Sequence, residues 1–546
     1  MNCAPQLLLL LVAALAVPVA ILFSCVLPGL RQRILSLLWV APIPALAAAL
    51  FGGTQPLLWD WAPGRVTLML NRPGAILLGV AALLWIGSGV YAPRYLRSEP
   101  HGGRFAVCWL LTLIGNIGVF ITADLPSFYL AFALVSVPAY GLLVHDATPK
   151  TQRAGAIYMA FTLLGENFLL IGFVLLAAAT PSGSLAIRDC LASLPASPWR
   201  DPTLALLIAG FGLKAGLVPL HPWMPLTYTA APAAAASVLS GAVVKAGVIG
   251  LIRFIPIDHG LPGWGGALAA AGLLSAFYGV AVGITQANPK TVLAYSSISQ
   301  LGLIAAVVGT GLVNSDRGTP LAVAFYAAHH ILAKGALFLV IGVVAATGSA
   351  RLWPVLFPAA VLALGLGGLP LTGGALAKLA VKQPLGNGVV NLLATLAAAG
   401  STLLMLHFLQ RLKKVATPDD KETAPTGLVL PWLAMALAAV IVPWLLYFAN
   451  GVGTFYGALM PAALWEALWP TLIGALLAIG LRHWAKFLPD VPEGDILVAG
   501  ERAARATASW GATLERTDTL LRRWPVACFS LLVVAIILGA LMLAGR

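Results

Sequence analysis

Apolar runs of about 20 residues follow one another along almost the whole chain, separated by short polar connections. A helix of that length crosses the hydrocarbon core of a bilayer and satisfies its own backbone hydrogen bonds there. Hydrophobic residues make up 60% of the 546 residues and charged residues only 9%, too few to cover a soluble protein of this size. The chain is therefore predicted to be an all-α polytopic membrane protein with about 16 transmembrane helices.

The predicted spans alternate with connections that are basic on one side of the membrane and nearly neutral on the other. The positive-inside rule places the basic connections in the cytoplasm and both termini outside. It also accounts for the net charge of +13 without nucleic acid. The predicted spans are 5–27, 34–53, 74–92, 105–123, 126–145, 154–179, 202–220, 229–252, 264–286, 291–313, 320–347, 353–377, 387–410, 428–449, 459–481 and 525–544. The basic connections contain Arg31/Arg33, Arg94/Arg97/Arg104, Lys150/Arg153, Lys290, Arg351, Arg411/Lys413/Lys414 and Arg482/Lys486.

The sequence carries no motif for a cofactor, a metal or a nucleotide. Its five cysteines are scattered and form no CxxC pair, which disfavours an iron–sulfur or zinc site. No glycine-rich phosphate loop follows a strand. We expect no cofactor and no catalytic site in this chain, so any energy source must be an ion gradient or a partner subunit.

Four lysines lie inside the apolar segments, and they are the strongest functional indication in the sequence. An ammonium group is costly in hydrocarbon, so an intramembrane lysine usually pairs with another polar group or lines a polar path. Several such lysines on different helices predict a polar path through the membrane, which is typical of a proton or ion conductor. They are Lys214, Lys245, Lys334 and Lys378.

The first two lysines lie in a segment, 210–253, that glycine and proline interrupt. Gly216 and Pro219 follow Lys214, and such residues break a helix at membrane depth only where the backbone is packed in protein or lines a cavity. A discontinuous helix beside an ionisable residue is the binding-site arrangement of many transporters. The alternative, that both lysines extend to the membrane interface, is disfavoured by the apolar residues around them.

A second interrupted helix is predicted over 363–388. Gly368 and Pro370 interrupt it and Lys378 follows. The second interrupted helix follows the first by five spans, and this odd offset turns it upside down relative to the first. The pattern predicts an inverted repeat in which each unit has a broken helix. Lys382, one turn beyond Lys378, is expected to extend to the interface.

The helix between the two breaks carries a histidine and a lysine one turn apart. His330 and Lys334 share a helix face, whereas His329 points elsewhere and is expected to be structural. Histidine exchanges protons near neutral pH, and a desolvated lysine can also lose its proton. The pair is predicted to bridge the two lysine sites, with a structural contact between helices as the alternative.

Glu166 is the only acidic residue deep in the first repeat. A carboxylate near Lys214 would hold that lysine charged, and moving the two apart would release its proton. This is the simplest form of a charge-switched proton pump, and a hydrogen-bonded structural acid is the alternative. His407 and Glu466 also lie in predicted spans and rank lower, as exit-path or interface groups.

Several ordered motifs resemble the proton-conducting antiporter-like family over about residues 105–410. The motifs are 210–253, KTVLAYSSISQLG at 290–302 and HHILAKGALFL at 329–339. The family includes the large membrane-arm subunits of respiratory complex I, the large Mrp cation/proton antiporter subunits and their equivalents in membrane-bound hydrogenases. The resemblance implies two inverted five-helix repeats, each with a broken helix, that form half-channels joined by a central hydrated axis.

Individual residues match the positions that the family uses. Lys214 resembles the lysine of its first broken helix, and Lys245 resembles a lysine on the next helix of many members. Lys334 is similar to the bridging lysine, with His330 one turn before it, and Lys378 matches the ionisable residue of the second broken helix.

One departure from the family is important. Members usually carry a glutamate in a stretch like YLxWE. Here the sequence is YLAFALVSVPAYGLL, and Ala133 occupies the position of that glutamate. Either Glu166 on the adjoining helix replaces the missing partner of Lys214, or the first half-channel is altered or inactive. We favour the first explanation.

Four regions are predicted along the chain. Residues 1–104 form N-terminal transmembrane helices, 105–253 the first half-channel, 254–414 the second, and 415–546 C-terminal helices. The last region includes a short amphipathic surface helix within 490–524, before the final span, because Trp510, Leu514 and Leu521 recur at helical spacing between charges.

The resemblance implies a proton-translocating membrane subunit of a complex I-like assembly, of NADH–quinone oxidoreductase or hydrogenase type. The alternatives are an Mrp-type cation/proton antiporter subunit and a proton-coupling subunit of an inorganic-carbon uptake complex. A purely structural anchor is disfavoured by the buried lysines. The expected partners are other membrane and peripheral subunits, lipid, and protons or Na⁺, in an inner (plasma) membrane of prokaryotic type. The ion, the direction of transport and the energy source stay open.

Overall fold

A computed structural model describes residues 4–24, 34–52, 57–61, 64–97, 102–418, 421–484, 488–498 and 500–502. Contacts divide the chain into Met1–Glu493 and Gly494–Arg546. The second unit is described only at 494–498 and 500–502, which are mostly helical. The predicted span 525–544 and most of the predicted surface helix, 490–524, lie outside the described residues.

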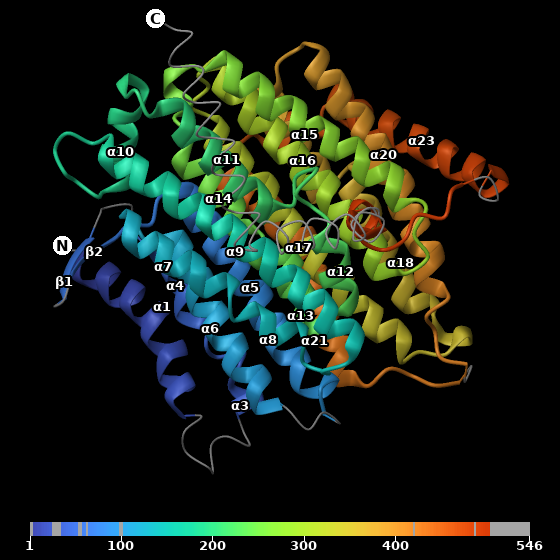
Figure 1. The fold of residues 1–546 in the computed structure, drawn as a ribbon. Helices are drawn as coiled ribbons and strands as arrows, with labels where there is room; N and C mark the ends of the chain where they lie inside the picture. The colour runs from blue at the N-terminus through green and yellow to red at the C-terminus, as the bar shows by residue number, and fades with distance from the viewer. Residues whose placement is uncertain are drawn as a thin grey trace, which may run out of the picture. The chain divides into compact units, whose positions relative to one another are not determined.

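The first unit is built almost entirely of helices (Figure 1). The all-α prediction misses one antiparallel hairpin among the described residues, β1 (Leu57–Trp61) paired with β2 (Gly64–Leu68). The helices are α1 (Ala4–Ser24), α3 (Ile34–Leu37), α4 (Ile43–Phe51), α5 (Arg72–Tyr95), α6 (Gly102–Ile121), α7 (Leu125–Ser136), α8 (Ala139–Leu143), α9 (Pro149–Ala178), α10 (Ile187–Ser193), α11 (Arg200–Ala215), α12 (Trp223–Ala230), α13 (Ala233–Val238), α14 (Lys245–Phe254), α15 (Pro262–Gly283), α16 (Pro289–Asn314), α17 (Thr319–Ala345), α18 (Trp353–Gly367), α19 (Gly373–Leu385), α20 (Val389–Lys413), α21 (Thr426–Ala449), α22 (Phe455–Leu459) and α23 (Pro461–Trp484).

Within the described residues, 11 helical segments are by themselves long and apolar enough to cross a membrane. The chain is therefore a polytopic membrane protein. The other predicted spans within the described residues correspond to α1, to the pair α3 and α4, and to the interrupted pairs α11–α12 and α18–α19. Helix α1 is a single uninterrupted helix, whereas the pieces of the three pairs are each too short to cross a membrane alone.

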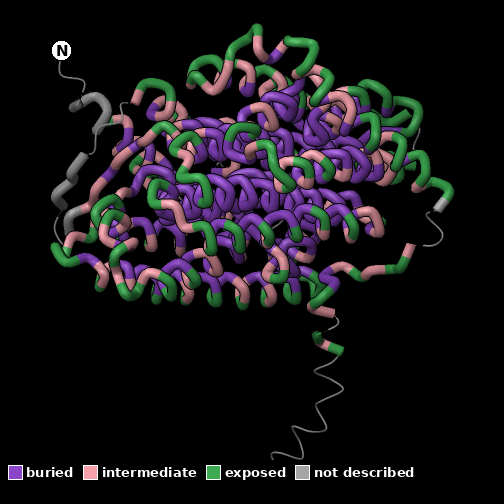
Figure 2. Tube along the Cα trace, turned by 90° about the horizontal axis from the view of Figure 1, so that it is seen from above, coloured by how far each residue is buried: buried purple, intermediate pink, exposed green. Residues whose placement is uncertain are grey.

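Three helical segments form the centre of the first unit. The apolar stretches of Ala233–His259, Pro289–Asn314 and Thr319–Ala345 are completely buried. Figure 2 shows the buried residues gathered inside, with exposed positions on the helices around them. A polar side chain on these three segments has no access to lipid, so it must find a partner inside the protein.

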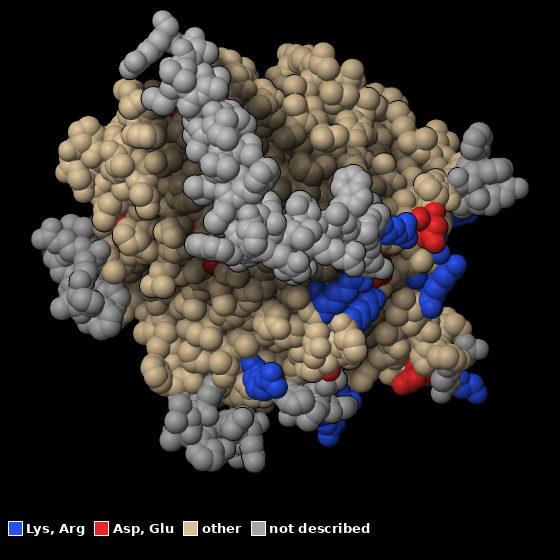
Figure 3. All heavy atoms as spheres, viewed as in Figure 1, with Lys and Arg blue, Asp and Glu red and all other residues tan. Residues whose placement is uncertain are grey.

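The outer helices present apolar side chains to their surroundings. Leu130 on α7, Leu437 on α21 and Leu476 on α23 are each at least 60% exposed. Charged side chains cover only a limited part of the face drawn in Figure 3. An apolar surface of this extent is typical of contact with lipid or with other membrane subunits.

Helices α15 and α16 pack at unusually short distance. Gly265, Gly272 and Gly279 recur every seven residues on one face of α15 and contact the backbone of α16. A Cβ atom at Gly272 would lie 2.5 Å from the carbonyl oxygen of Gly302. Small residues allow this approach, and close helix packing replaces the hydrophobic effect as a source of association in a membrane.

Two helices are interrupted inside the membrane domain. Helix α11 ends at Ala215, followed by Gly216 at φ +73°, before α12 begins at Trp223. Helix α18 ends at Gly367, followed by Gly368 at φ +94°, before α19 begins at Gly373. Both glycines have the left-handed conformation that ends helices. The connections contain Pro219 and Pro370, so neither helix can continue through them.

The second break depends on a close approach that only glycine permits. A Cβ atom at Gly374 would lie 1.7 Å from the carbonyl oxygen of Gly365. We expect Gly374→Ala to force α18 and α19 apart and to destabilise the protein by about 2 kcal/mol. The measurement is the midpoint of heat-induced loss of monodisperse protein in detergent. Gly263→Ala on α15 is the control, because nothing lies within 4 Å of its Cβ position. Equal midpoints for the two variants would contradict the expectation.

Candidate functional site: a chain of buried ionisable groups

Lys214 lies in the last turn of α11, at the first break. Its side chain is buried, and its Nζ donates a hydrogen bond to Ser136 Oγ at 2.8 Å. The ammonium group also lies 5.7 Å from the centre of the Phe132 ring and 5.9 Å from that of Tyr158. The aromatic faces and the negative end of the α11 dipole both favour a cation, so this pocket can hold Lys214 charged inside the protein.

Glu166 reaches this pocket from α9. It is buried and interacts electrostatically with Lys214 and with Ser136. One of its carboxylate oxygens, Oε1, has no hydrogen-bond partner among the described residues, which is uncommon for a buried oxygen. Ser136 on α7 lies one turn beyond Ala133, the position of the absent glutamate, and occupies the place beside Lys214. The structure thus brings Glu166 and Lys214 together around a serine that sequence analysis missed.

Lys245 lies at the centre of the protein and is completely buried. It follows a π-helical turn, Leu239–Val243, between α13 and α14. Its Nζ lies 2.6 Å from His330 Nδ1 and donates to the carbonyl of Ser240 at 2.9 Å. Because a π-turn shifts the side chains that follow it, the turn helps to aim Lys245 at α17.

His330 and Lys334 share one face of α17 and are also completely buried. Lys334 Nζ donates to the carbonyl of Leu293 on α16 at 2.8 Å. His330 interacts electrostatically with both Lys245 and Lys334, and its Nε2 has no hydrogen-bond partner in the part of the chain that the structure describes. A proton on any of these groups raises the energy of a proton on its neighbours. The arrangement therefore favours movement of one charge along the group rather than simultaneous protonation.

Lys378 lies on α19 and reaches back to the second break. Its Nζ donates to the carbonyl of Gly367 at the end of α18. The last carbonyl groups of a helix have no partner within the helix and carry partial negative charge, so they stabilise a cation. Lys214 and Lys378 thus both lie beside a helix break: Lys214 is in the last turn of α11 and bonds Ser136, whereas Lys378 is on α19 and bonds the end of α18.

His329 has a different position from the one expected for a structural residue. A Cβ atom on Gly373 would lie 2.7 Å from His329 Nδ1, so the imidazole ring lies against the beginning of α19. Both ring nitrogens are buried and find no hydrogen-bond partner within the described ranges, and the ring interacts electrostatically with His330 and Lys378. His329 thus lies between the group formed by Lys245, His330 and Lys334 and the second break, and it joins the candidate path.

Three further polar side chains continue the path from α17, and no sequence motif predicts them. Tyr326 lies four residues before His330 on the same helix face. Its hydroxyl donates to Gln300 Oε1 at 2.7 Å, and Gln300 Nε2 donates to Ser401 Oγ at 2.8 Å. This connects α17, α16 and α20 through buried polar groups.

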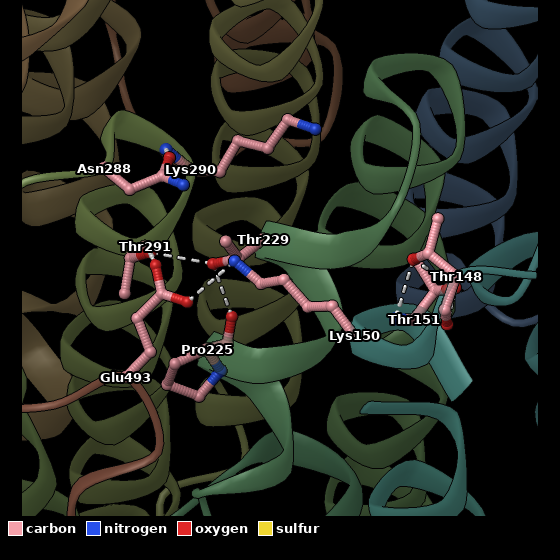
Figure 4. Close-up of polar contacts among 9 residues, drawn as sticks. All are labelled: Thr148, Lys150, Thr151, Pro225, Thr229, Asn288, Lys290, Thr291 and Glu493. Atoms are coloured by element: carbon pink, nitrogen blue, oxygen red, sulfur yellow. Dashed lines mark hydrogen bonds and ion pairs between the residues drawn. The ribbon is translucent and has the colours of Figure 1, made fainter. Parts of the chain in front are cut away.

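A second polar cluster lies where α9 and α16 begin and α12 ends (Figure 4). Glu493 accepts a hydrogen bond from Thr291 Oγ1 at 3.0 Å and forms an ion pair with Lys150 at 3.3 Å. Thr291 is also hydrogen bonded to Thr229 on α12, at 2.8 Å. Lys290 donates to the carbonyl of Ala231. We name this end of the helices the basic end; it is connected by hydroxyl groups to the half-helix that follows Lys214.

The two lower-ranked residues lie apart from the lysines of the centre. His407 Nε2 lies 2.8 Å from the carbonyl of Gln286, near the basic end. Glu466 on α23 forms an ion pair with Lys382 at 2.7 Å, and both side chains are 47% exposed. The expectation that Lys382 simply extends to the interface therefore omits its partner.

A protein-family model described as "NADH:quinone oxidoreductase/Mrp antiporter, TM" matches residues 122–406. Among curated proteins, an uncharacterized protein of Mycobacterium tuberculosis is 33% identical over 58% of this chain and 52% of its own length. Hydrogenase-4 component B of Escherichia coli is 29% identical over 51% of this chain and 43% of its own. The chain thus spans about half the length of these relatives. A Na(+)/H(+) antiporter subunit of Bacillus subtilis is 27% identical over 71% of this chain and 83% of its own.

Two solved structures share the fold. The Mrp complex of Dietzia sp. contains a chain that superposes with a TM-score of 0.79 at 20% identity, over 99% of this chain and 63% of that one. An archaeal membrane-bound sulfane sulfur reductase contains another with a TM-score of 0.69 at 22% identity, over 85% and 99%. At these identities the likeness concerns the arrangement of helices.

Proposed function

Because the chain belongs to the NADH:quinone oxidoreductase/Mrp antiporter transmembrane family, we propose that it translocates protons as one subunit of a larger membrane complex. The resemblance seen in the sequence is confirmed by the family match. The chain is a multi-pass, antiporter-like membrane subunit of the prokaryotic type. The movement of protons, and the complex in which it occurs, are the content of the proposal.

The observation that carries the proposal is the contact between Lys245 and His330 at the centre of the protein. Two proton-exchanging groups lie 2.6 Å apart in a region without access to lipid or bulk water. A buried ammonium and imidazole placed side by side cost energy, so an arrangement of this kind is retained for function rather than stability. Proton exchange along hydrogen-bonded groups accounts for it.

The proposed path follows the buried groups from one broken helix to the other. Protons enter from the basic end, which the positive-inside rule assigns to the cytoplasm, and reach Lys214. They pass Lys245, His330 and Lys334 and leave near Lys378. Two inverted half-channels, 105–253 and 254–414, account for the place of a terminal lysine beside each break. The break at Gly368/Pro370 supplies the carbonyl group that Lys378 bonds, and the break at Gly216/Pro219 ends α11 directly after Lys214.

Ser136 gives a test of how the first lysine is held. We expect Ser136→Ala to lower the rate of proton translocation several-fold, because Lys214 loses its side-chain hydrogen bond and Glu166 loses the group between them. The rate is measured as the quenching of a pH-sensitive dye in sealed vesicles that contain the whole complex. Thr112→Ala is the control, since among the described residues that buried hydroxyl bonds only the Cys108 carbonyl of its own helix. Equal rates for the two variants would remove Ser136 from the path.

We propose a complex I-like assembly, of NADH–quinone oxidoreductase or hydrogenase type, as the setting, with an external redox reaction as the driving force. An Mrp-type antiporter is the second candidate, favoured by the alignment with the Na(+)/H(+) antiporter subunit of Bacillus subtilis over 83% of that protein. A proton-coupling role in inorganic-carbon uptake is the third. Few described carboxylates lie inside the membrane domain, which favours protons over Na⁺.

The deciding experiment is mass spectrometry of the intact complex, purified gently through a tag on this chain. Iron–sulfur, hydrogenase or quinone-reductase partners would support the redox-driven pump. A set of small hydrophobic subunits, together with sodium-dependent pH changes in vesicles, would establish an antiporter instead. A single large zinc-containing partner would establish carbon uptake, and isolation of the chain without partners would overturn the proposal that it works within a complex.

A further inference from the structure

A cavity of about 300 Å³ opens between α19, α20 and α23. Its outer part is lined by Asn387 and Gly388, which are exposed, and its inner part by Lys378 and by Tyr326, which is almost completely buried. The lining therefore extends from the surface to Lys378, at the second break, and to the hydroxyl group of Tyr326, which continues the central path. It connects the two inner groups with the exterior.

The cavity lies at the end of the membrane domain opposite to the basic end. It is lined by the first turns of α20 and α23, whereas the far end of α20 carries Arg411 and Lys413. If the basic end faces the cytoplasm, as the positive-inside rule requires, the cavity opens on the outer side. The groups that line it are therefore placed where a proton would leave.

Lys382 and Glu466 form an ion pair in the lining of this cavity. Lys382 Nζ donates to both oxygens of Glu466, at 2.7 and 2.8 Å, and Lys382 follows Lys378 by one turn of α19. Helix α23 is otherwise largely apolar and exposed. A charged pair facing hydrocarbon would lose the hydration of both ions, whereas a pair facing a water-filled cavity keeps much of it. The cavity therefore explains why an acid and a base are tolerated at this position.

We infer that this cavity is the outer opening of the proton path and that Glu466 is its last proton acceptor. The inference rests on the proposed function. The ammonium group of Lys378 gives its proton to water in the cavity and becomes a neutral amine. The Glu466 carboxylate accepts that proton and then releases it to the outer solution, returning to its ionised form. Lys382 is a positioning residue, which holds the carboxylate in the cavity between transfers.

The first test compares charge-neutral variants in vesicles that contain the whole complex. Glu466→Gln is expected to lower the rate of proton translocation about tenfold, because it removes the acceptor and keeps the volume. Lys382→Met is expected to lower the rate less, and Lys382→Arg to restore it, because arginine can also hold a carboxylate. Asp258→Asn is the control, since the exposed pair of Asp258 and Arg317 lies at the same end and does not line the cavity.

The outcomes separate this inference from the proposed function. If Lys378→Met abolishes translocation and Glu466→Gln leaves it unchanged, the path exists but does not use this opening. If neither variant has an effect, the proposed function itself fails. If Lys382→Arg is no better than Lys382→Met, the positioning role of Lys382 is wrong.

A second measurement does not depend on the ion pair. Asn391 lines the cavity and is half-buried, so Asn391→Cys, in a background with the five native cysteines replaced by serine, places a thiol inside it. A membrane-impermeant thiol reagent added from the outer side should label this cysteine and lower the rate at least threefold. Leu445→Cys is the control, since Leu445 is 61% exposed on α21 away from the cavity. Labelling from the cytoplasmic side alone would overturn the inference.

Discussion

Lys245→Met is expected to stop proton translocation almost completely, to below about a hundredth of the wild-type rate, because general acid–base groups contribute factors of 10² or more. The substitution removes the ammonium group that lies 2.6 Å from His330 and leaves a side chain of similar volume. Lys245 stands where the first half of the path meets α17, and no other side chain hydrogen bonds His330 in the described part of the chain. A break here cannot be bypassed through a neighbouring group.

The assay is dye quenching in vesicles that contain the complete complex, with assembly checked by size-exclusion chromatography. Methionine removes a buried charge, so the variant should be at least as stable as the wild type. A lost rate with an unchanged melting midpoint then identifies a functional group rather than a structural one. Lys413→Met, at the exposed end of α20, is the matched control and should keep the full rate. Substantial translocation by Lys245→Met would exclude the central route.

Glu166→Gln is expected to lower the rate tenfold or more and to decide how the first half works without the usual glutamate. If Glu166 modulates the charge of Lys214, its neutral amide cannot do so, although it can still fill the pocket. The alternative, an inactive first half-channel, predicts a rate equal to that of the wild type. The contact of Ser136 with Lys214 and the unpaired Oε1 of Glu166 support the first outcome.

A rescue experiment sharpens this test. Ala133 lies one turn before Ser136 on α7 and is half-buried, so Ala133→Glu should bring a carboxylate towards Lys214 from that helix. Added to Glu166→Gln, it should recover a measurable part of the rate. Recovery would show that the position of the acid can move between α7 and α9 while its role is kept. If the Glu166→Gln variant translocates protons and the double variant does not, Glu166 is not the partner of Lys214.

The local features of the candidate site can be predicted from the sequence. The breaks after Lys214 and before Lys378 follow from glycine and proline, and His330 and Lys334 share a face because they are four residues apart. These need no knowledge of which helices are neighbours. The division of the chain into half-channels rests on the same pattern and stays a prediction.

The remaining site residues depend on packing between helices. Ser136 looks like an ordinary helical serine, and only the approach of α7 to α11 turns its hydroxyl towards Lys214. His329 is off the face of His330 and therefore looks structural in the sequence, yet α19 begins against that other face. The partner of Lys382 lies 84 residues away on α23. The pair of β1 and β2 escapes prediction because its residues read as a loop between two apolar runs.

The glycine contacts between α15 and α16 have a mechanical consequence. Two helices whose backbones touch at Gly265, Gly272 and Gly279 cannot slide or rotate past each other without collision. Helix α16 nevertheless touches both ends of the path, through Thr291 at α12 and through Gln300 at α17. Helices α15 and α16 therefore form a rigid unit that connects the two halves. A shift of the half-helix α12 would therefore move α15 and α16 together and displace Gln300. Proton uptake at one side and release at the other would then be coupled through the same pair of helices.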